Sequence, residues 1–139
     1  MSLQVSLIID NDLSDLDQLT KVANKFLAEA KVSDRAVYAV NLVIEETVTN
    51  IIKYGYDDTD NHKIAVNLQP DSEHMVVSIE DDGHEFDPLQ APEPDTQSPL
   101  EQRRIGGLGI HLVRNVVDKI EYRRENDKNI LEMSIGSDA

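Results

Sequence analysis

The chain contains no cysteine and no tryptophan among its 139 residues, and it has no long hydrophobic run. The absence of cysteine excludes disulfide bonds, thiolate metal sites and a catalytic thiol. No segment approaches the roughly 20 apolar residues of a membrane-spanning helix, and the N-terminus lacks the basic start and apolar core of a signal peptide. We therefore expect a cytoplasmic protein.

Basic residues are also scarce, because 13 lysines and arginines face 27 aspartates and glutamates and leave a formal net charge of −14. Phosphate backbones and anionic lipid surfaces are bound by clustered Lys and Arg, so we expect no nucleic-acid and no membrane partner. The charge still permits a basic protein partner, or a nucleotide held by backbone N–H groups and a metal ion. The length fits one domain with its own core, which we place at residues 1–139.

The spacing of the apolar residues predicts strands in series with helices, without strict strand–helix alternation. This order predicts an α+β fold, a two-layer α/β sandwich in which a mixed, mainly antiparallel sheet carries its helices on one face. In the first half we expect a strand through Ile9, a helix capped by Ser14, and a helix from Ser33 to about Tyr54 with Gly55 as a left-handed cap. A hairpin of about 63–68 and 74–81 follows, around a turn at 70–73. The second half is expected to hold a helix that opens at 106–109 and a hairpin of about 120–124 and 130–135.

Four prolines interrupt the pattern between the first hairpin and the last helix, among acidic, amide and serine side chains. Connections of this length are uncommon in a compact domain unless they are functional or disordered. We therefore predict a lid or a disordered segment at about residues 88–106, mobile between about 90 and 104 when no nucleotide is bound.

The helix that ends near Tyr54 carries two polar residues beside its apolar stripe. Glu46 and Asn50 are four positions apart, so their side chains lie one above the other on the same face. A carboxylate there can take a proton, and an amide oxygen is a ligand that Mg²⁺ accepts together with phosphates and waters. The alternative is a surface glutamate bonded to a helical neighbour. Glu45 points about 100° away, so we expect it to be solvated.

Asp81 stands at the exit of an apolar strand and begins the sequence Asp81-Asp82-Gly83. A carboxylate in this place can accept a hydrogen bond from an exocyclic amine such as that of adenine, and Gly83 removes a side chain that would obstruct a flat ring. The alternative is an ordinary turn, for which Asp-Gly is a common signal.

Gly106-Gly107-Leu108-Gly109 opens the next helix. Closely spaced glycines let the backbone approach a ligand, and the helix N-terminus offers unpaired N–H groups to phosphate oxygens. The alternative is a flexible hinge at the end of a loop. Arg103 and Arg104, just before the glycines, are either solvated lid charges or a source of positive charge for a γ-phosphate.

In this order, the three stretches resemble the Bergerat ATP-binding fold of gyrase, heat-shock protein 90, histidine kinases and the mismatch-repair protein MutL. The resemblance covers nearly the whole chain and is strongest to the anti-sigma-factor serine kinases. It rests on Glu46-Thr47-Val48-Thr49-Asn50-Ile51-Ile52, Asp81-Asp82-Gly83 with Phe86-Asp87-Pro88, Gly106-Gly107-Leu108-Gly109-Ile110-His111-Leu112-Val113, and Val117-Asp118-Lys119-Ile120-Glu121-Tyr122.

The resemblance implies a role for each motif residue. Glu46 is the expected general base, Asn50 the expected Mg²⁺ ligand and Asp81 the residue expected to recognise adenine. Gly83 is expected to make room for the base. The stretch Gly106-Gly107-Leu108-Gly109 completes the expected nucleotide site, with Gly107 and Gly109 facing the phosphates and Gly106 as the hinge of the lid.

The chain departs from the family pattern at three places. Glu85 stands where the kinases often have glycine, and Tyr54 where relatives often have histidine. The Gly-Thr that often precedes the last strand is replaced by Asp127-Lys128-Asn129. These departures leave the base, the metal ligand and the adenine contact in place.

The function that the resemblance implies is an ATP- and Mg²⁺-dependent serine-protein kinase. It would phosphorylate a STAS-domain anti-anti-sigma protein and sequester a sigma factor or a similar regulator, as a possible homodimer. The alternatives are a nucleotide-gated protein-binding module without phosphotransfer, and the catalytic half of a split histidine kinase.

Overall fold

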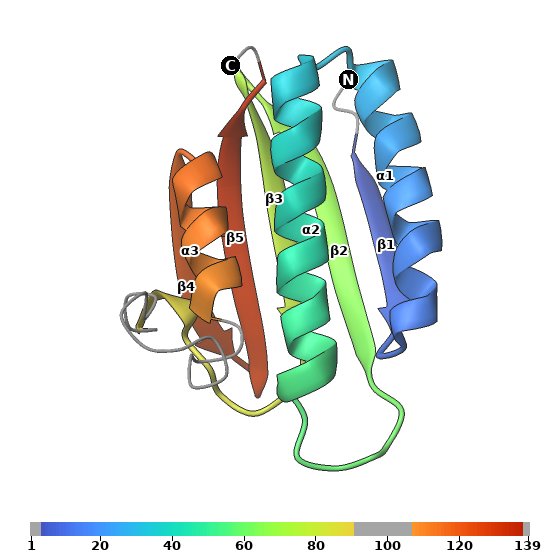
Figure 1. Ribbon diagram of the computed structural model, residues 1–139, viewed down its shortest axis with the longest axis vertical. Helices are drawn as coiled ribbons and strands as arrows, with labels where there is room; N and C mark the ends of the chain where they lie inside the picture. Colours follow the sequence, from blue (N-terminus) through green and yellow to red (C-terminus); the bar gives the residue numbers. More distant parts are fainter. Residues whose placement is uncertain (1–3, 91–106, 138–139) are drawn as a thin grey trace.

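In the described part of the chain, one five-stranded sheet is covered on a single face by three α-helices (Figure 1). The computed structural model describes residues 4–90 and 107–137, and of residues 107–110 it describes the backbone alone. The elements are β1 (Val5–Asp10), α1 (Leu16–Ala30), α2 (Asp34–Tyr54), β2 (Lys63–Asp71), β3 (His74–Asp81), α3 (Gly107–Val116), β4 (Lys119–Glu125) and β5 (Lys128–Gly136), with short 3₁₀ turns at Leu13–Asp15 and Pro88–Gln90.

The α+β two-layer sandwich is confirmed, but every strand pairing in the described sheet is antiparallel. The strand order is β1-β2-β3-β5-β4, and the four neighbouring pairs are all antiparallel. β3 and β4 run in the same direction and would form a parallel pair if they were neighbours. The two-residue turn at Asn126-Asp127, where both residues have positive φ (52° and 62°), instead folds β5 back into that place. The expected mixed sheet is thereby corrected.

The core lies between the sheet and the helices, and the alternation of apolar residues along the strands forms it. The central strands contribute Ile64, Val66, Leu68, Met75, Val77, Ile79, Leu131, Met133 and Ile135, each at most 5% exposed. The helices contribute Leu19, Ala23, Leu27, Val40, Val43, Ile44 and Val48, each at most 1% exposed. Burying one large aliphatic side chain stabilises the fold by about 1.5–3 kcal/mol, so this layer dominates stability.

The helix ends agree with the sequence in part. Ser33 caps α2 as expected, since its hydroxyl accepts a hydrogen bond from Ala36 N at 3.1 Å. Ser14 is not a cap: it lies inside the 3₁₀ turn before α1, and Asp12 accepts from its N–H at 2.9 Å. Gly55 follows α2 with a right-handed φ of −83°, so the expected left-handed cap is wrong. The helix can end here without it, because Gly55 N still donates to the Ile51 carbonyl at 2.8 Å.

One row of paired residues crosses the whole sheet on its helix-facing side. The register pairs Ile9 with Ile64, Ile64 with Asp81, Asp81 with Asn129, and Asn129 with Arg124. The row is apolar on β1 and β2 and polar on β3, β5 and β4. We call it the cross-sheet row. Its polar half lies where β3 ends, which is the region of the predicted site.

No helix in the described part of the chain is both long enough and apolar enough to cross a bilayer.

Candidate functional site

The central helix α2 carries Glu46 and Asn50 on the flank that faces away from α1. Asn41 marks the α1 flank, because its Nδ2 donates to Asn24 Oδ1 at 2.7 Å. At about 100° per residue, Glu46 lies about 140° and Asn50 about 180° around the helix from Asn41. Because α1 and α3 lie on opposite sides of α2 (Figure 1), both predicted side chains project on the α3 side.

Both side chains are available to a ligand. Glu46 and Asn50 are half-buried, and neither side chain forms a hydrogen bond or an ion pair within residues 4–90 and 107–137. Placing a polar group beside the core is unfavourable unless the group has a hydrogen-bond partner. Binding a ligand group would therefore stabilise both side chains. Glu45 is exposed, which confirms the expectation for that residue.

Asp81 is a buried carboxylate at the end of β3, 6% exposed. Its Oδ1 accepts hydrogen bonds from Gly83 N at 2.8 Å and from Asn129 Nδ2 at 3.1 Å. Burial raises the pKa of the Asp81 carboxyl, against the opposing effects of these two hydrogen bonds and of the Arg124 cation. Among the described residues no hydrogen bond reaches Oδ2, so this oxygen is left to accept from a ligand.

The Asp81-Asp82-Gly83 turn packs directly against the end of α2. His84 N donates to the Gly55 carbonyl at 2.9 Å. A Cβ at Gly83 would overlap that carbonyl oxygen and would lie 2.9 Å from Asp81 Oδ1. Gly83 is therefore required by packing, and its predicted role beside a base stays a prediction.

Asn129 is the central residue that sequence reasoning missed. It is 8% exposed, and its side chain joins β3, β4 and the loop after Gly83. A signal was present, because the alternation of Leu131, Met133 and Ile135 continues to position 129 and places an amide on the core-facing side of β5. The sequence showed only that Asp127-Lys128-Asn129 replaces the family's Gly-Thr.

A second polar cluster joins the α2–β2 loop to the turn after β3. The His62 ring stacks on Tyr56, with centroids 4.2 Å apart and 10° between the planes. His62 Nε2 lies 2.7 Å from Asp58 Oδ1, and Nδ1 lies 3.0 Å from Asp82 Oδ1. These contacts raise the pKa of His62, the Asp58 hydrogen bond most. Burial first, and then the charges of Asp81, Asp82 and Asp58, raise the pKa of the Tyr56 hydroxyl.

The helix predicted after the glycines is present. α3 begins at Gly107 and ends at Val116, so Gly107, Leu108 and Gly109 form its first turn. Their predicted contact with phosphates stays a prediction. Gly106, both lid arginines and residues 91–106 of the predicted lid lie outside the described residues, while Pro88–Gln90 at its start forms a 3₁₀ turn.

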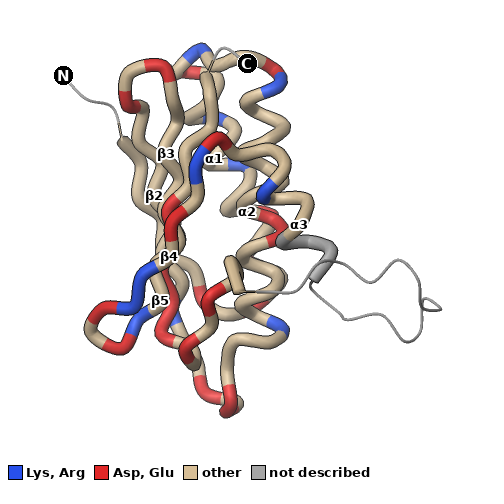
Figure 2. The backbone as a smooth tube through the Cα atoms, turned by 90° about the vertical axis from the view of Figure 1, so that its left-hand side faces the viewer, with Lys and Arg blue, Asp and Glu red and all other residues tan. Residues whose placement is uncertain are grey.

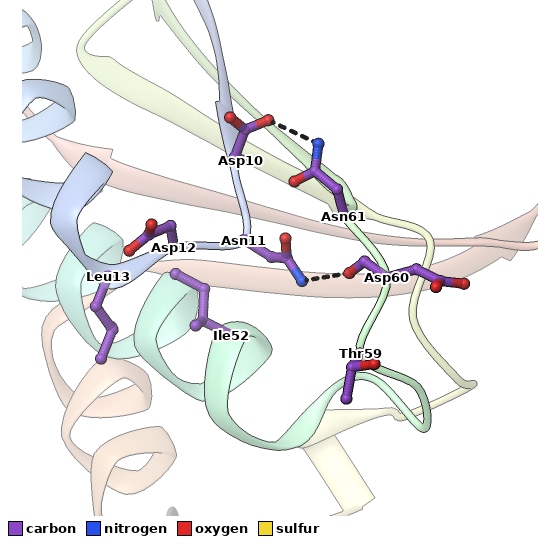
Figure 3. Close-up of a pocket in the computed structure, with 8 residues that line it drawn as sticks. All are labelled: Asp10, Asn11, Asp12, Leu13, Ile52, Thr59, Asp60 and Asn61. Carbon is purple, nitrogen blue, oxygen red and sulfur yellow. Dashed lines mark hydrogen bonds between the residues drawn. The ribbon is translucent and has the colours of Figure 1, made fainter.

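An open depression lies on the other flank of α2 (Figure 3). It has a volume of about 500 Å³ and is lined by Asp10, Asn11, Asp12, Leu13, Ile52, Thr59, Asp60 and Asn61. None of the predicted site residues belongs to it. Its polar groups are largely bonded to one another, as in the Asn11 Nδ2 hydrogen bond to the Asp60 carbonyl at 3.3 Å.

The family model of the histidine kinase-like ATPase domain matches residues 9–135. The chain belongs to this family, which confirms the resemblance drawn from its three motifs.

Two named relatives and one solved structure show the range of similarity. The serine/threonine-protein kinase BtrW of Bordetella bronchiseptica is 29% identical over 104 residues, covering 73% of this chain and 72% of the relative. The anti-sigma F factor of Oceanobacillus iheyensis is 29% identical over 83 residues, covering 59% of this chain and 56% of the relative. The crystal structure of the RsbU and RsbW domains of Rv1364c from Mycobacterium tuberculosis superposes with a TM-score of 0.66 at 14% identity, covering 96% of this chain and 32% of that one, which shows the shared fold alone.

The residues of the site fit a magnesium nucleotide in their chemistry. Counting the described residues alone, Asp81 is a buried acceptor with one oxygen free of hydrogen bonds, and the amide oxygen of Asn50 has no partner. Within the described ranges no three His, Cys, Asp or Glu side chains are grouped to hold a metal. A Mg²⁺ at Asn50 would take phosphate oxygens and waters as its other ligands, the arrangement that this ion favours.

Proposed function

We propose that this protein is an ATP-dependent serine-protein kinase of the anti-sigma type. It binds Mg²⁺-ATP, phosphorylates a serine of a STAS-domain anti-anti-sigma protein, and sequesters a sigma factor or a similar regulator. The observation that carries the proposal is Asp81, a buried carboxylate that keeps one acceptor oxygen at the exit of β3. The name of the serine/threonine-protein kinase BtrW supports the kinase activity, and the name of the anti-sigma F factor supports a sigma factor as a partner.

Each residue of the site has one task in this proposal. Asp81 accepts a hydrogen bond from the adenine amino group through Oδ2, and Asn50 gives its amide oxygen to Mg²⁺. The backbone N–H groups at the start of α3, from Gly107 to Gly109, bind phosphate oxygens. Glu46 takes the proton of the serine hydroxyl as that oxygen attacks the γ-phosphorus, and positioning and charge stabilisation carry the rest of the transfer.

A bound Mg²⁺ would supply positive charge beside a mainly acidic surface. Asp57, Asp58, Asp60 and Asp82 lie around the ends of α2 and β3, and the whole chain carries a formal net charge of −14. A free nucleotide with several negative charges is repelled by such a surface. We therefore expect ATP with Mg²⁺ to raise the melting temperature clearly more than ATP with a chelator, because binding to the native state stabilises it.

The decisive experiment measures transfer of label from γ-labelled ATP to a STAS-domain protein. Glu46→Ala should lower the transfer rate by at least about 100-fold, the usual contribution of a positioned base, and should leave the thermal shift by Mg²⁺-ATP in place. Glu45→Ala, a change of the same kind at an exposed position, is the control and should retain the wild-type rate. A fully active Glu46→Ala protein would show that the base lies elsewhere.

The absence of a described partner for Glu46 favours a second function. Within residues 4–90 and 107–137, no group orients this carboxylate for proton transfer. The protein would then be a nucleotide-gated binding module, in which ATP or ADP sets the affinity for a protein partner without chemistry. The labelling assay separates the two: a module shows the thermal shift but no transfer. Label on histidine, which acid removes, would instead indicate a split histidine kinase.

A further inference from the structure

The Asn129 side chain makes five hydrogen bonds at the polar half of the cross-sheet row. Its Nδ2 donates to Asp81 Oδ1 at 3.1 Å and to the His84 carbonyl at 2.8 Å. Its Oδ1 accepts from the Tyr122 hydroxyl at 2.6 Å, from Arg124 at 3.1 Å and from a backbone N–H at 3.3 Å. The amide therefore has donors on one side and acceptors on the other.

This arrangement fixes the orientation of the amide. A rotated carboxamide would turn its N–H groups towards the Arg124 cation and its oxygen towards the Asp81 carboxylate, which is unfavourable at both ends. Both N–H groups are used, so Asn129 has no donor left for a ligand. Its contribution to a nucleotide site can act only through Asp81.

Arg124 strengthens the same arrangement from β4. One guanidinium nitrogen donates to the Gly83 carbonyl at 2.9 Å and to Asn129 Oδ1 at 3.1 Å. The cation draws electron density towards Oδ1, which makes the Nδ2–H groups of the amide better donors. Hydrogen bonds in a chain of this kind strengthen one another. Asp81 Oδ1 is thus held by donors from two directions, while Oδ2 is left open.

We propose that Asn129 is a positioning residue, which holds Asp81 as an oriented anion so that the site selects a base with an exocyclic amino group over one with a carbonyl in that place. The proposal rests on the proposed nucleotide binding and adds the residue that sets the selectivity for the base. An ionised carboxylate only accepts hydrogen bonds, so it pairs with the amino group of adenine and repels the carbonyl oxygen of hypoxanthine. A protonated Asp81 would be able to donate to that carbonyl, and selectivity would fall.

The test compares the binding of ATP and inosine triphosphate at pH 6 and pH 8. Wild-type protein should prefer ATP by at least about tenfold at both pH values, because an unpaired acceptor in the site penalises the wrong base. Asn129→Leu, of similar volume without the amide, should lose most of this preference, and should lose more of it at pH 6. Tyr122→Phe is the matched control: it removes one bond to Asn129 but keeps the Asn129–Asp81 bond, so the preference should remain.

A leucine variant that folds and keeps the wild-type preference at both pH values would overturn the proposal. The carbon NMR signal of the Asp81 carboxyl tests the same point in unsubstituted protein without nucleotide, should the leucine variant fail to fold. We expect that signal to show an ionised carboxylate throughout pH 6–8, and titration of the carboxyl within this range would refute the role of Asn129. Wild-type protein that binds neither nucleotide would refute the proposed function instead, while the NMR result still decides the state of Asp81.

Discussion

Gly83 shows how a single residue joins two predicted motifs. Its backbone lies against the Gly55 carbonyl, at the junction between the end of α2 and the turn after β3. The motif pattern explained this glycine by the room that a bound base needs. The structure adds a cause within the protein itself, since even a methyl group has no room.

Gly83→Ala should therefore destabilise the protein whether or not a nucleotide binds. The new Cβ would overlap the Gly55 carbonyl oxygen, which belongs to the backbone and is held in place by the hydrogen bond from His84 N. We expect a loss of about 1–3 kcal/mol in the free energy of unfolding, typical of overpacking, measured by urea denaturation. Glu85→Ala, at an exposed position two residues away, should change it by less than about 0.5 kcal/mol. Equal stability of the two variants would contradict this packing.

Two single-residue predictions of position are confirmed: Glu45 is exposed, as helical spacing predicts, and Asp81 stands at the end of β3. The roles of the motif residues stay predictions. Asn129 was missed because its importance depends on strand register, which places it between Asp81 and Arg124. A two-residue shift of β5 would keep its amide on the same face of the sheet but move it away from both partners, and the apolar alternation does not exclude such a shift.

At the scale of elements, His62 connects the α2–β2 loop with the exit of β3. Its two ring nitrogens contact Asp58 and Asp82, one from each segment. The pKa of His62 is raised in the folded state, so protonation stabilises the fold. That stabilisation is complete below the unfolded pKa of about 6.5 and disappears as pH rises through the folded value.

His62→Gln should therefore destabilise the protein more at pH 6 than at pH 8.5. The pKa of Asp58 is lowered, chiefly by its bond to His62, so the pair also weakens when acid protonates that carboxylate below about pH 4. Urea denaturation of both proteins across this range measures the difference. His74→Gln is the control, because the His74 ring contacts one carboxylate, Asp118 at 3.3 Å, and should show a smaller pH-dependent difference. A difference for His62→Gln that grows with pH would refute the ion pair.

The sequence predicted the type and order of the elements better than their ends. The turn after β2 was expected at residues 70–73, yet β2 continues through Pro70 to Asp71. Pro70 lies beyond Leu68, the last residue of β2 paired with the described part of β1, and proline is tolerated where a strand has a free side. The caps expected at Ser14 and Gly55 are wrong because other hydrogen bonds form there. Asp12 accepts from Ser14 N, and Gly55 N donates to the Ile51 carbonyl without a left-handed φ.

At the scale of the whole molecule, the formal charge of −14 is unevenly spread. The α2–β2 loop, the lowest part of the chain in Figure 2, carries Asp57, Asp58 and Asp60. Acidic side chains also lie on the loop after β3, at Asp82, Glu85 and Asp87. Their repulsion is released when the chain unfolds, so the folded state is the one that the net charge penalises.

The melting temperature should therefore rise by a few degrees between about 0.01 M and about 0.15 M NaCl, as the screening length falls from about 30 Å to about 8 Å. A protein carrying both Asp60→Asn and Glu85→Gln has two fewer negative charges, and its melting temperature should depend less on salt. Neither side chain forms a hydrogen bond or ion pair within the described ranges, so the fold itself should be unaffected. A melting temperature that falls with salt would mean that attractive ion pairs dominate instead.

The place of β5 has a consequence for how the polypeptide is made. β5 lies between β3 and β4 but follows both of them along the chain. Until residues 128–136 have left the ribosome, the edge of β3 that pairs with β5 stays unpaired, the condition in which nascent chains associate wrongly. Asp81 lacks Asn129 during the same interval. The pairing of β5 therefore covers the edge of β3 and completes the proposed nucleotide site in one event.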